Sequence, residues 1–384
     1  MTWMRALPLL PFACALPAIA QHTSVLFIGN SYTYVNDLPN TFRQLALSLG
    51  DTVDVSSSAP GGYTFEAHWE YAPTQTAIAS RPWDVVVLQE QSQIPSFPDG
   101  MSLSSSFNSA RLLVERIKQN RECTLPVFYM TWGRENGDDQ NCDFWPPVCT
   151  YDGMQQLLRE RYLAMATANH ARTSPVGVAW KQVRDTAPQI DLYADDGSHP
   201  SVEGTYLAAC VFYSTLFHGS SVGATFLGGV APATAATLQQ VASAIVLDSA
   251  ATWALNGSPG LSAELFWLET VPPNTYIFHP PGQGQHLWQC SDGQTSTAYE
   301  PSFQFTPGDY VMTHIYTDLC GITDTASWPF TAWDEGSIGI EEPTANTTAR
   351  VVAAAPGTID VMGHAGDLLR VFDLQGRLLL TQRL

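Results

Sequence analysis

A serine lies where a buried strand is expected to end. Residues 25–28 are Val, Leu, Phe and Ile, and Gly29-Asn30-Ser31 follow directly. A run that is apolar on both faces predicts a strand of a covered parallel sheet, and the loops beyond the carboxyl ends of such strands carry chemistry. Ser31 could therefore serve as a nucleophile if a base lies close to it. For a serine taken alone, a turn residue or helix cap is the alternative.

His199 and Asp196 are the candidates for that base and for the group that orients it. They lie in "YADDGSHPSVEGTYLAAC", where the aspartate precedes the histidine by three residues in a loop containing Gly and Pro. One tight turn can bring the carboxylate to Nδ1 of the imidazole and leave Nε2 free to face a hydroxyl. Asp195 is an alternative carboxylate. A solvated loop with Ser201 as a helix N-cap is the structural alternative.

A tetrahedral oxyanion needs hydrogen-bond donors that converge on one point. The backbone N–H of Ser31 is one candidate. Gly61-Gly62 follows another expected strand, and a residue without Cβ lets its N–H approach a ligand closely. The apolar strand expected at 83–89 runs into a polar segment whose amide side chains are Gln89, Gln91 and Gln93.

These residues belong to a longer alternating pattern between residue 24 and about 256. Strands are expected at 24–29, 83–89, 125–132 and 174–180, and helices at 38–50, 104–120, 152–170, 201–219 and 233–255. Such alternation predicts an α/β fold with a parallel sheet covered by helices on both faces.

In order and spacing, the blocks described above resemble the SGNH (GDSL-type) hydrolase superfamily across roughly residues 24–220. The resemblance implies a flavodoxin-like three-layer sandwich with Ser31 as nucleophile, His199 as general base and Asp196 as its orienting group. It also implies an oxyanion hole made by the N–H groups of Ser31 and Gly62 and one side-chain amide. The usual Gly-x-Asn-Asp block is replaced by "LQEQSQ". The amide role then passes to Gln89, with Gln91 as the alternative.

Three further residues are candidates for the substrate pocket. His68 follows the glycine block, although packing in the core is the commoner role for such a residue. Trp132 and Arg134 open "MTWGRENGDDQNCDFWPPVC", a long loop at the catalytic end of the expected sheet. Loops of this length are functional or disordered, and a disulfide between Cys142 and Cys149 would favour order.

The composition excludes some classes of partner. The 384 residues carry 17 Lys and Arg against 36 Asp and Glu, a formal net charge of -19. An acidic surface repels phosphate backbones, so we expect no nucleic acid partner. No CxxC or paired-histidine spacing occurs, so no zinc site is expected, and the proposed chemistry needs no cofactor.

The amino-terminal segment and the cysteines indicate export. Residues 1–20 have one arginine, a short apolar run and a small-residue end, which is the layout of a secretory signal peptide. No later segment has the ~20 apolar residues of a membrane span. Export permits disulfides. Besides Cys142 with Cys149, we expect a weaker pair of Cys290 with Cys320, and buried free thiols at Cys123 and Cys210.

The composition changes at residues 256–260. Short alternating stretches rich in aromatic residues then predict a β-sandwich at 257–335, which resembles a PKD-type module. Residues 336–384 form a linker and a terminal segment that resembles the C-terminal sorting domain of type IX secretion, through "DLLRVFDLQGRLLL", read as two strands around a turn. That resemblance implies export across the outer membrane, after which the tail is either removed or linked to the cell surface.

The expected organisation is therefore a signal peptide at 1–20, a catalytic domain at 21–256, a β-sandwich at 257–335 and a sorting segment at 336–384. The expected function is a secreted serine esterase acting on a small-molecule or carbohydrate ester, with a short acyl group such as acetyl. A lipase or lysophospholipase of the same superfamily and a non-catalytic surface-binding protein are the alternatives.

Overall fold

The structure is a computed structural model, and it describes residues 22–383 with gaps at 257–262, 264–266, 272–273, 281, 283, 333–349, 355–357, 363–367 and 373–377. Side chains are not described at 102–104, at 267 and from 350 onward. The expected signal peptide lies outside the described residues. Within the described part of the chain, no helix combines the length and the apolar character needed to span a membrane.

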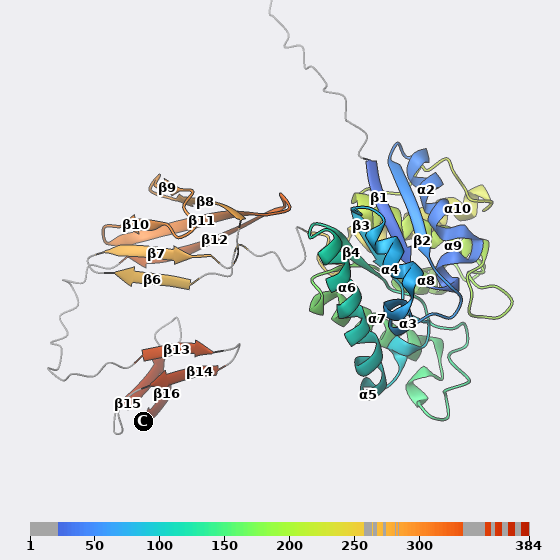
Figure 1. The fold of residues 1–384 in the computed structure, drawn as a ribbon, viewed down its shortest axis with the longest axis horizontal. Coiled ribbons are helices and arrows are strands. Elements are labelled where there is room, and N and C mark those ends of the chain that lie inside the picture. Colours follow the sequence, from blue (N-terminus) through green and yellow to red (C-terminus); the bar gives the residue numbers. More distant parts are fainter. Residues whose placement is uncertain are drawn as a thin grey trace, which may run out of the picture.

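A five-stranded parallel sheet forms the centre of the first part of the chain (Figure 1). Its order is β2-β1-β3-β4-β5, with strands β1 (His22–Ile28), β2 (Thr52–Ser58), β3 (Val85–Leu88), β4 (Leu125–Tyr129) and β5 (Arg172–Ser174). Ile28 pairs with Ser58 on one side and with Leu88 on the other, so these three strands end at the same edge. The order is that of the flavodoxin-like fold, which confirms the expected fold class.

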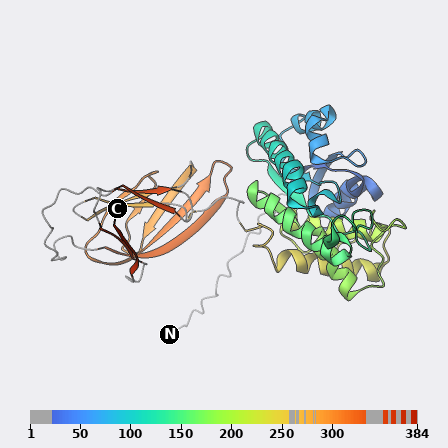
Figure 2. The same cartoon turned by 90° about the horizontal axis from the view of Figure 1, so that it is seen from below.

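Helices cover both faces of this sheet, as Figure 2 shows in a second view. Helices α3, α4 and α6 pack together, and α2, α8, α9 and α10 form another group. The bounds are α1 (Ser31–Tyr34), α2 (Leu38–Ser48), α3 (Phe65–Glu70), α4 (Ala72–Ala79), α5 (Asp99–Ser102), α6 (Asn108–Asn120), α7 (Tyr151–Ala168), α8 (Val176–Thr186), α9 (Val202–Phe217) and α10 (Pro232–Leu247). Helix α9 is buried from Gly204 to Thr215 without interruption. Such a helix, apolar all round, belongs to the interior.

One expected strand is wrong. Residues 174–180 were expected to be extended, but β5 ends at Ser174 and α8 begins at Val176. The buried residues Val176, Ala179, Trp180 and Val183 follow the spacing of one helix face. That spacing extends past residue 180, so a window ending at Trp180 shows only an apolar run, which fits a short strand equally well.

The second part of the chain contains only strands among its described residues, in two antiparallel sheets. Strands β6 (Trp267–Val271), β7 (Thr275–His279) and β10 (Ser302–Gln304) form the first, and β8 (Gly284–Cys290), β9 (Thr295–Ser296), β11 (Gly308–Asp318) and β12 (Thr323–Ala332) form the second. Phe278, Trp288, Phe303 and Met312 are buried in their shared core. This arrangement confirms the expected β-sandwich.

Two hairpins follow the sandwich. Strands β13 (Arg350–Ala354) and β14 (Thr358–Met362) pair antiparallel, as do β15 (Leu368–Phe372) and β16 (Leu378–Arg383). The second hairpin contains the two strands expected around the Asp-Leu-Gln-Gly turn. The turn residues at 373–377 lie outside the described residues.

The disulfides confirm one expected pair and correct the others. Cys142 bonds to Cys149 as expected. Cys320, however, bonds to Cys123 rather than to Cys290, across 197 positions of sequence. Cys290 lies buried as a free thiol in the sandwich core, and Cys210 is the other buried free cysteine. Cys123 is therefore not a free thiol, because its sulfur is bonded to Cys320 in the turn between β11 and β12.

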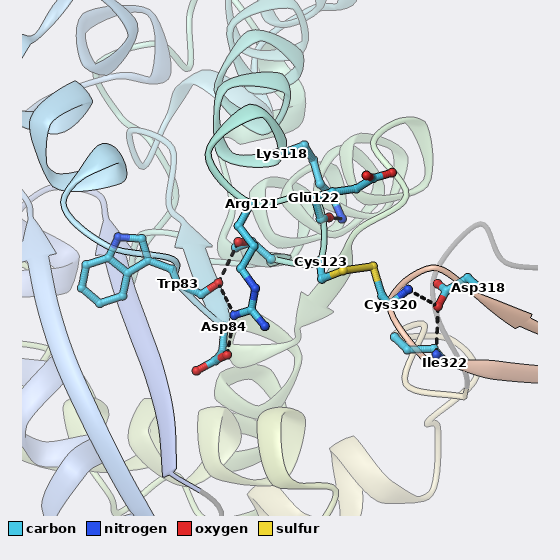
Figure 3. The surroundings of a disulfide bond; sticks show 10 residues. Trp83, Asp84, Lys118, Arg121, Glu122, Cys123, Asp318, Cys320 and Ile322 are labelled. Carbon is cyan, nitrogen blue, oxygen red and sulfur yellow. Dashed lines mark hydrogen bonds and ion pairs between the residues drawn. A yellow bond between two sulfur atoms is a disulfide. The ribbon is translucent and has the colours of Figure 1, made fainter. Parts of the chain in front are cut away.

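Figure 3 shows how the Cys123–Cys320 bond joins the two parts of the chain. Cys123 lies between α6 and β4, before the amino end of the sheet. Arg121 fixes this loop by donating to the Asp84 carboxylate at 2.6 Å. On the other side, the Asp318 carboxylate accepts the N–H groups of Cys320 and Ile322 and so shapes the turn. The sandwich is thus bonded to the end of the sheet opposite to Ser31.

Candidate active site

Ser31, His199 and Asp196 form a continuous hydrogen-bonded chain. The Ser31 Oγ lies 2.8 Å from Nε2 of His199, and Nδ1 of His199 lies 2.5 Å from Oδ2 of Asp196. A carboxylate can only accept, so Nδ1 carries the ring proton and Nε2 is left to accept from the serine hydroxyl. The fold brings the turn after β1, which carries Ser31, next to the loop before α9, which carries Asp196 and His199 and lies 165 or more positions later in the sequence.

The turn after β1 presents Ser31 at the start of α1. Asn30 is the N-cap, and its Oδ1 accepts the N–H of Tyr32. Its Nδ2 donates to the carbonyl of Tyr63 at 3.0 Å, which ties the turn to the glycine block. Gly29 cannot be replaced easily, because a Cβ there would lie 2.5 Å from side-chain oxygens of Gln89 and Thr33. Packing therefore requires glycine at position 29, and the Asn30 side chain holds the turn that presents Ser31.

A tight turn joins Asp196 to His199. Oδ1 of Asp196 accepts the backbone N–H groups of Ser198 and His199 at 3.0 and 2.9 Å. Gly197 has φ of +64°, a conformation that glycine adopts without strain. Partial burial acts to raise the pKa of Asp196, but the hydrogen bonds from His199 and Ser198 outweigh it and lower that pKa. The carboxylate stays ionised, and Asp196 rather than Asp195 contacts the ring.

A stack of aromatic rings supports this turn. Trp132 is sandwiched between Tyr32 and Trp180, with ring centroids 4.6 and 3.8 Å apart and nearly parallel planes. Its Nε1 donates to the carbonyl of Ser198, while the Tyr32 hydroxyl lies 2.7 Å from the Ser198 Oγ. Trp132 is completely buried. Its expected role as a pocket wall is thus wrong, because both faces of its ring are covered, and it supports the turn that carries Asp196 and His199 instead.

Asn36 joins the nucleophile segment to the histidine segment. It has φ of +53°, and its Nδ2 lies 3.0 Å from the carbonyls of Pro200 and Ser201 and from Oγ1 of Thr205. Asn36, Tyr32 and Trp180 were not among the residues expected at the site. The polar and aromatic run "SYTYVND" was a usable signal, since such residues directly after a buried strand are often structural partners of the site.

His68 is also not a pocket residue. It is fully buried, and its Nε2 donates to the carbonyl of Gly29 at 2.8 Å. Its Nδ1 accepts from Oγ1 of Thr74, which in turn lies 2.8 Å from the Ser58 hydroxyl. Burial lowers the pKa of His68, so the ring is neutral, as this hydrogen-bond pattern requires. The expected pocket role is corrected to a structural one beneath the nucleophile turn.

Gln89 has no free hydrogen for an oxyanion. It is fully buried, and its Nε2 donates to Oδ1 of Asn30 and to the carbonyl of Glu90. Its Oε1 accepts the N–H of Asn30 and the hydroxyl of Thr33, both at 2.9 Å. These bonds correct the expectation that Gln89 completes the oxyanion hole. Gln89 holds the nucleophile turn in place.

The alternative, Gln91, keeps one amide hydrogen available. Its Nε2 donates to Oε1 of Gln93 at 3.1 Å, and its second hydrogen has no partner among the described residues. Its Oε1 accepts the N–H groups of Gln93 and Ile94, which fixes the orientation of the amide. Gln91 lies three positions after Leu88, just as Ser31 lies three positions after Ile28, the partner of Leu88 in the sheet.

Two backbone N–H groups are also available at this edge of the sheet. Neither the N–H of Ser31 nor that of Gly62 has a hydrogen-bond partner within the described parts of the chain. Gly62 has φ of +73° in an exposed turn after β2. Both groups are thus in the state that an oxyanion hole needs, and the expected roles of Ser31 and Gly62 stay predictions.

Arg134 lines a cavity beside His199. The cavity has a volume of about 500 Å³, and its other lining residues include Asn136, Asp139, Gln140 and Asp196. Arg134 pairs with the buried carboxylate of Asp138 at 3.2 Å. The walls are polar, with several free hydrogen-bonding groups. Of the three candidate pocket residues, only Arg134 lies where the sequence analysis expected it.

Comparison with known proteins gives a fold but no family model. No protein-family model matches the chain, and no curated protein matches it. Among solved structures, it is similar to a DUF4886 family protein from Bacteroides uniformis, with a TM-score of 0.51 and 19% identity over 59% of this chain and 96% of that one. This likeness establishes the fold.

Two other similar structures have TM-scores below 0.5. One is a protein described as a candidate SGNH hydrolase from Slackia heliotrinireducens, with a TM-score of 0.42, 30% identity, and coverage of 51% of this chain and 100% of that one. Another is the acetyl xylan esterase AlAXEase, with a TM-score of 0.41, 12% identity, and coverage of 50% and 99%.

Proposed function

We propose that this protein is a serine ester hydrolase that works through an acyl-serine intermediate. The observation that carries the proposal is the hydrogen-bonded chain from the Ser31 hydroxyl through His199 to the Asp196 carboxylate. A nucleophile, a base and a group that orients the base are the minimum for this chemistry. They lie at the edge of the sheet where the N–H groups of Ser31 and Gly62 have no partner among the described residues.

The reaction follows from these positions. As the Ser31 Oγ attacks the ester carbonyl carbon, its proton passes to Nε2 of His199, and Asp196 stabilises the resulting imidazolium. The tetrahedral intermediate collapses, and the departing alkoxide takes the proton from Nε2. A water molecule then attacks the acyl-serine while His199 again accepts its proton. The carboxylic acid leaves, and the Ser31 hydroxyl is restored.

The negative charge on the carbonyl oxygen requires donors that are already in place. We assign this role to the N–H groups of Ser31 and Gly62 and to the side-chain amide of Gln91. Such donors act without reorganisation at the moment of reaction, and loss of one typically costs about 100- to 1,000-fold in turnover.

The cavity supports a hydrophilic substrate. Its lining by Arg134, Asn136, Asp139 and Gln140 offers donors and acceptors for hydroxyl groups. The Arg134 charge is already paired with Asp138. A short acyl group on a polyol or sugar fits these walls better than a long acyl chain, which would need an apolar surface. We therefore favour a carbohydrate ester over a lipid.

The test is hydrolysis of a short-chain nitrophenyl ester by the purified protein and by Ser31→Ala. We expect a loss of at least about 1,000-fold in kcat, because the nucleophile is absent. Thermal unfolding of both proteins controls for folding. Acetylated sugars then define the leaving alcohol. Equal, slow turnover by the two proteins would favour the non-catalytic surface-binding alternative.

We further propose that the protein is exported and that its parts divide at residues 20, 256 and 335. The two disulfides support export, because such bonds persist in oxidising compartments. The PKD-like character of the sandwich and cell-surface attachment through residues 336–384 belong to the same proposal. Sequencing of the amino terminus and intact mass of the secreted protein test it.

A further inference from the structure

Glu90 is a carboxylate that the proposed mechanism leaves without a role. It lies two positions after the end of β3 and is 1% exposed. Among the residues that the structure describes, no Lys, Arg or His forms an ion pair with it. Burial of an acid without a cation is costly unless hydrogen bonds satisfy its oxygens. The position of those hydrogen bonds indicates what Glu90 does.

Its carboxyl group joins two segments that carry the candidate oxyanion donors. Oε1 accepts the backbone N–H of Phe65 at 2.9 Å and that of Gln91 at 2.7 Å. Phe65 is the first residue of α3, three positions after Gly62, and Gln91 carries the candidate amide. Oε2 accepts the hydroxyl of Ser106 at 2.8 Å, which fixes the orientation of the carboxyl group.

The backbone of Glu90 is held equally firmly. Its N–H donates to the hydroxyl of Tyr162 at 3.2 Å, and its carbonyl accepts from Nε2 of Gln89 at 2.6 Å. Gln89 in turn holds the backbone N–H of Asn30 beside the nucleophile. Through two consecutive residues, the end of β3 is therefore bonded to the nucleophile turn, the glycine turn and Gln91.

We propose that Glu90 is a positioning residue for the oxyanion hole, which sets the Gly62 N–H and the Gln91 amide at a fixed separation. This inference rests on the proposed esterase function. What matters is the place of one acceptor atom, Oε1, rather than the charge of the side chain. A displacement of either donor by about 1 Å would weaken stabilisation of the transition state by about 100-fold.

The proposal predicts opposite effects on kcat for two conservative substitutions of Glu90. Glu90→Gln loses the charge but can keep an Oε1 at the same place, with its amide donating to Ser106 Oγ. Glu90→Asp keeps a carboxylate but withdraws it by one methylene from Phe65 and Gln91. We expect Glu90→Gln to retain kcat within about threefold and Glu90→Asp to lose about 100-fold, with KM nearly unchanged in both.

Two further variants serve as references. Gln91→Ala should resemble Glu90→Asp, because it deletes one of the donors that Glu90 positions. Ser106→Ala removes the bond to Oε2 alone and should lower kcat by less than about fivefold. All variants are measured with the same nitrophenyl ester, beside wild type and Ser31→Ala, and their thermal unfolding is recorded.

The outcomes separate this proposal from the proposed function. Wild type no faster than Ser31→Ala would overturn both. An active wild type with an equally active Glu90→Asp, or with a Glu90→Gln as slow as Glu90→Asp, would overturn only the role of Glu90. A rise in KM that accounts for the whole loss in Glu90→Asp would do the same. If Glu90→Asp does not fold, Glu90→Gln alone decides: retained kcat supports the proposal, and lost kcat overturns it.

Discussion

At the scale of single residues, the candidate site divides into groups that we propose to act on substrate and groups that hold them in place. Ser31, His199 and Asp196 could be predicted from the sequence because a nucleophile, a base and an orienting acid need particular side chains at particular turns. The roles of Gln89, His68 and Trp132 could not. Each is a polar or aromatic residue near the carboxyl edge of the sheet, where site residues are expected. Sequence alone does not show whether its polar atoms face the cavity or the core. Their hydrogen bonds decide this.

Glu90 gives a pH-dependent stability that can be measured at this scale. Burial raises the pKa of Glu90 from 4.5 to about 7, although its hydrogen bonds oppose this and only Glu66 of α3 adds to it. Tyr162 of α7, the other titratable group against it, stays neutral because burial raises its own pKa. Between pH 4.5 and 7 the unfolded chain has lost a proton that the native protein retains. The stability contribution of Glu90 is therefore complete below pH 4.5 and declines up to pH 7.

The measurement compares wild type with Glu90→Gln by urea unfolding between pH 4.5 and 8. We expect the free energy of unfolding of wild type, relative to the variant, to fall by about 3 kcal/mol as the pH rises to 7. Parallel curves for the two proteins over this range would contradict the expectation.

At the scale of elements, hydrophobic patterning predicts the longer strands and helices of the first part, but it does not predict the short helices α3 and α4 and it predicts a strand in place of α8. The residues 174–180 alone show only a short apolar run, which predicts a strand where the structure has helix α8. This difference affects the candidate site, because α8 carries Trp180 and the Trp180 ring stacks on Trp132. Gly177 explains how the helix comes so close: a Cβ there would lie 2.1 Å from the carbonyl of Thr131. Only tertiary packing reveals this contact.

Gly177→Ala should push α8 away from the end of β4. We expect a loss of about 1–3 kcal/mol in stability, typical of overpacking. Esterase activity should also fall, because Trp180 would no longer support the ring that holds Ser198. Gly100→Ala is the matched control: an added methyl there meets no atom within 4 Å, so both stability and activity should stay near those of wild type. Equal effects of the two substitutions would argue against this role for α8.

At the scale of the whole molecule, the Cys123–Cys320 bond between the two parts was the feature hardest to predict from the sequence. The apolar residues around Cys123 in the sequence predict a buried free thiol. Its partner is 197 positions away, and the pairing depends on how the sandwich meets the sheet. Cysteine pairing cannot be deduced from one sequence when several combinations are open. The short Cys142–Cys149 loop was predictable because its own length brings the two thiols together.

The Cys123–Cys320 bond should keep the two parts together after the chain is cut between them. Limited proteolysis that cleaves once between these cysteines should give one species on a non-reducing gel and two after reduction. With Cys320→Ser, two species should appear without a reductant, whereas Cys290→Ser should behave like wild type because its thiol is free. Separation of the wild-type fragments without reductant would contradict the pairing.

The same bond has a consequence for large substrates. It fastens the sandwich before the amino end of β4, while Ser31 follows the carboxyl end of β1 in the same parallel sheet. The fastening point and the reactive hydroxyl therefore face away from each other. A polymer that carries esters along its backbone can therefore reach the Ser31 hydroxyl without passing the Cys123–Cys320 bond. The attachment of the β-sandwich at this point does not limit the length of such a polymer.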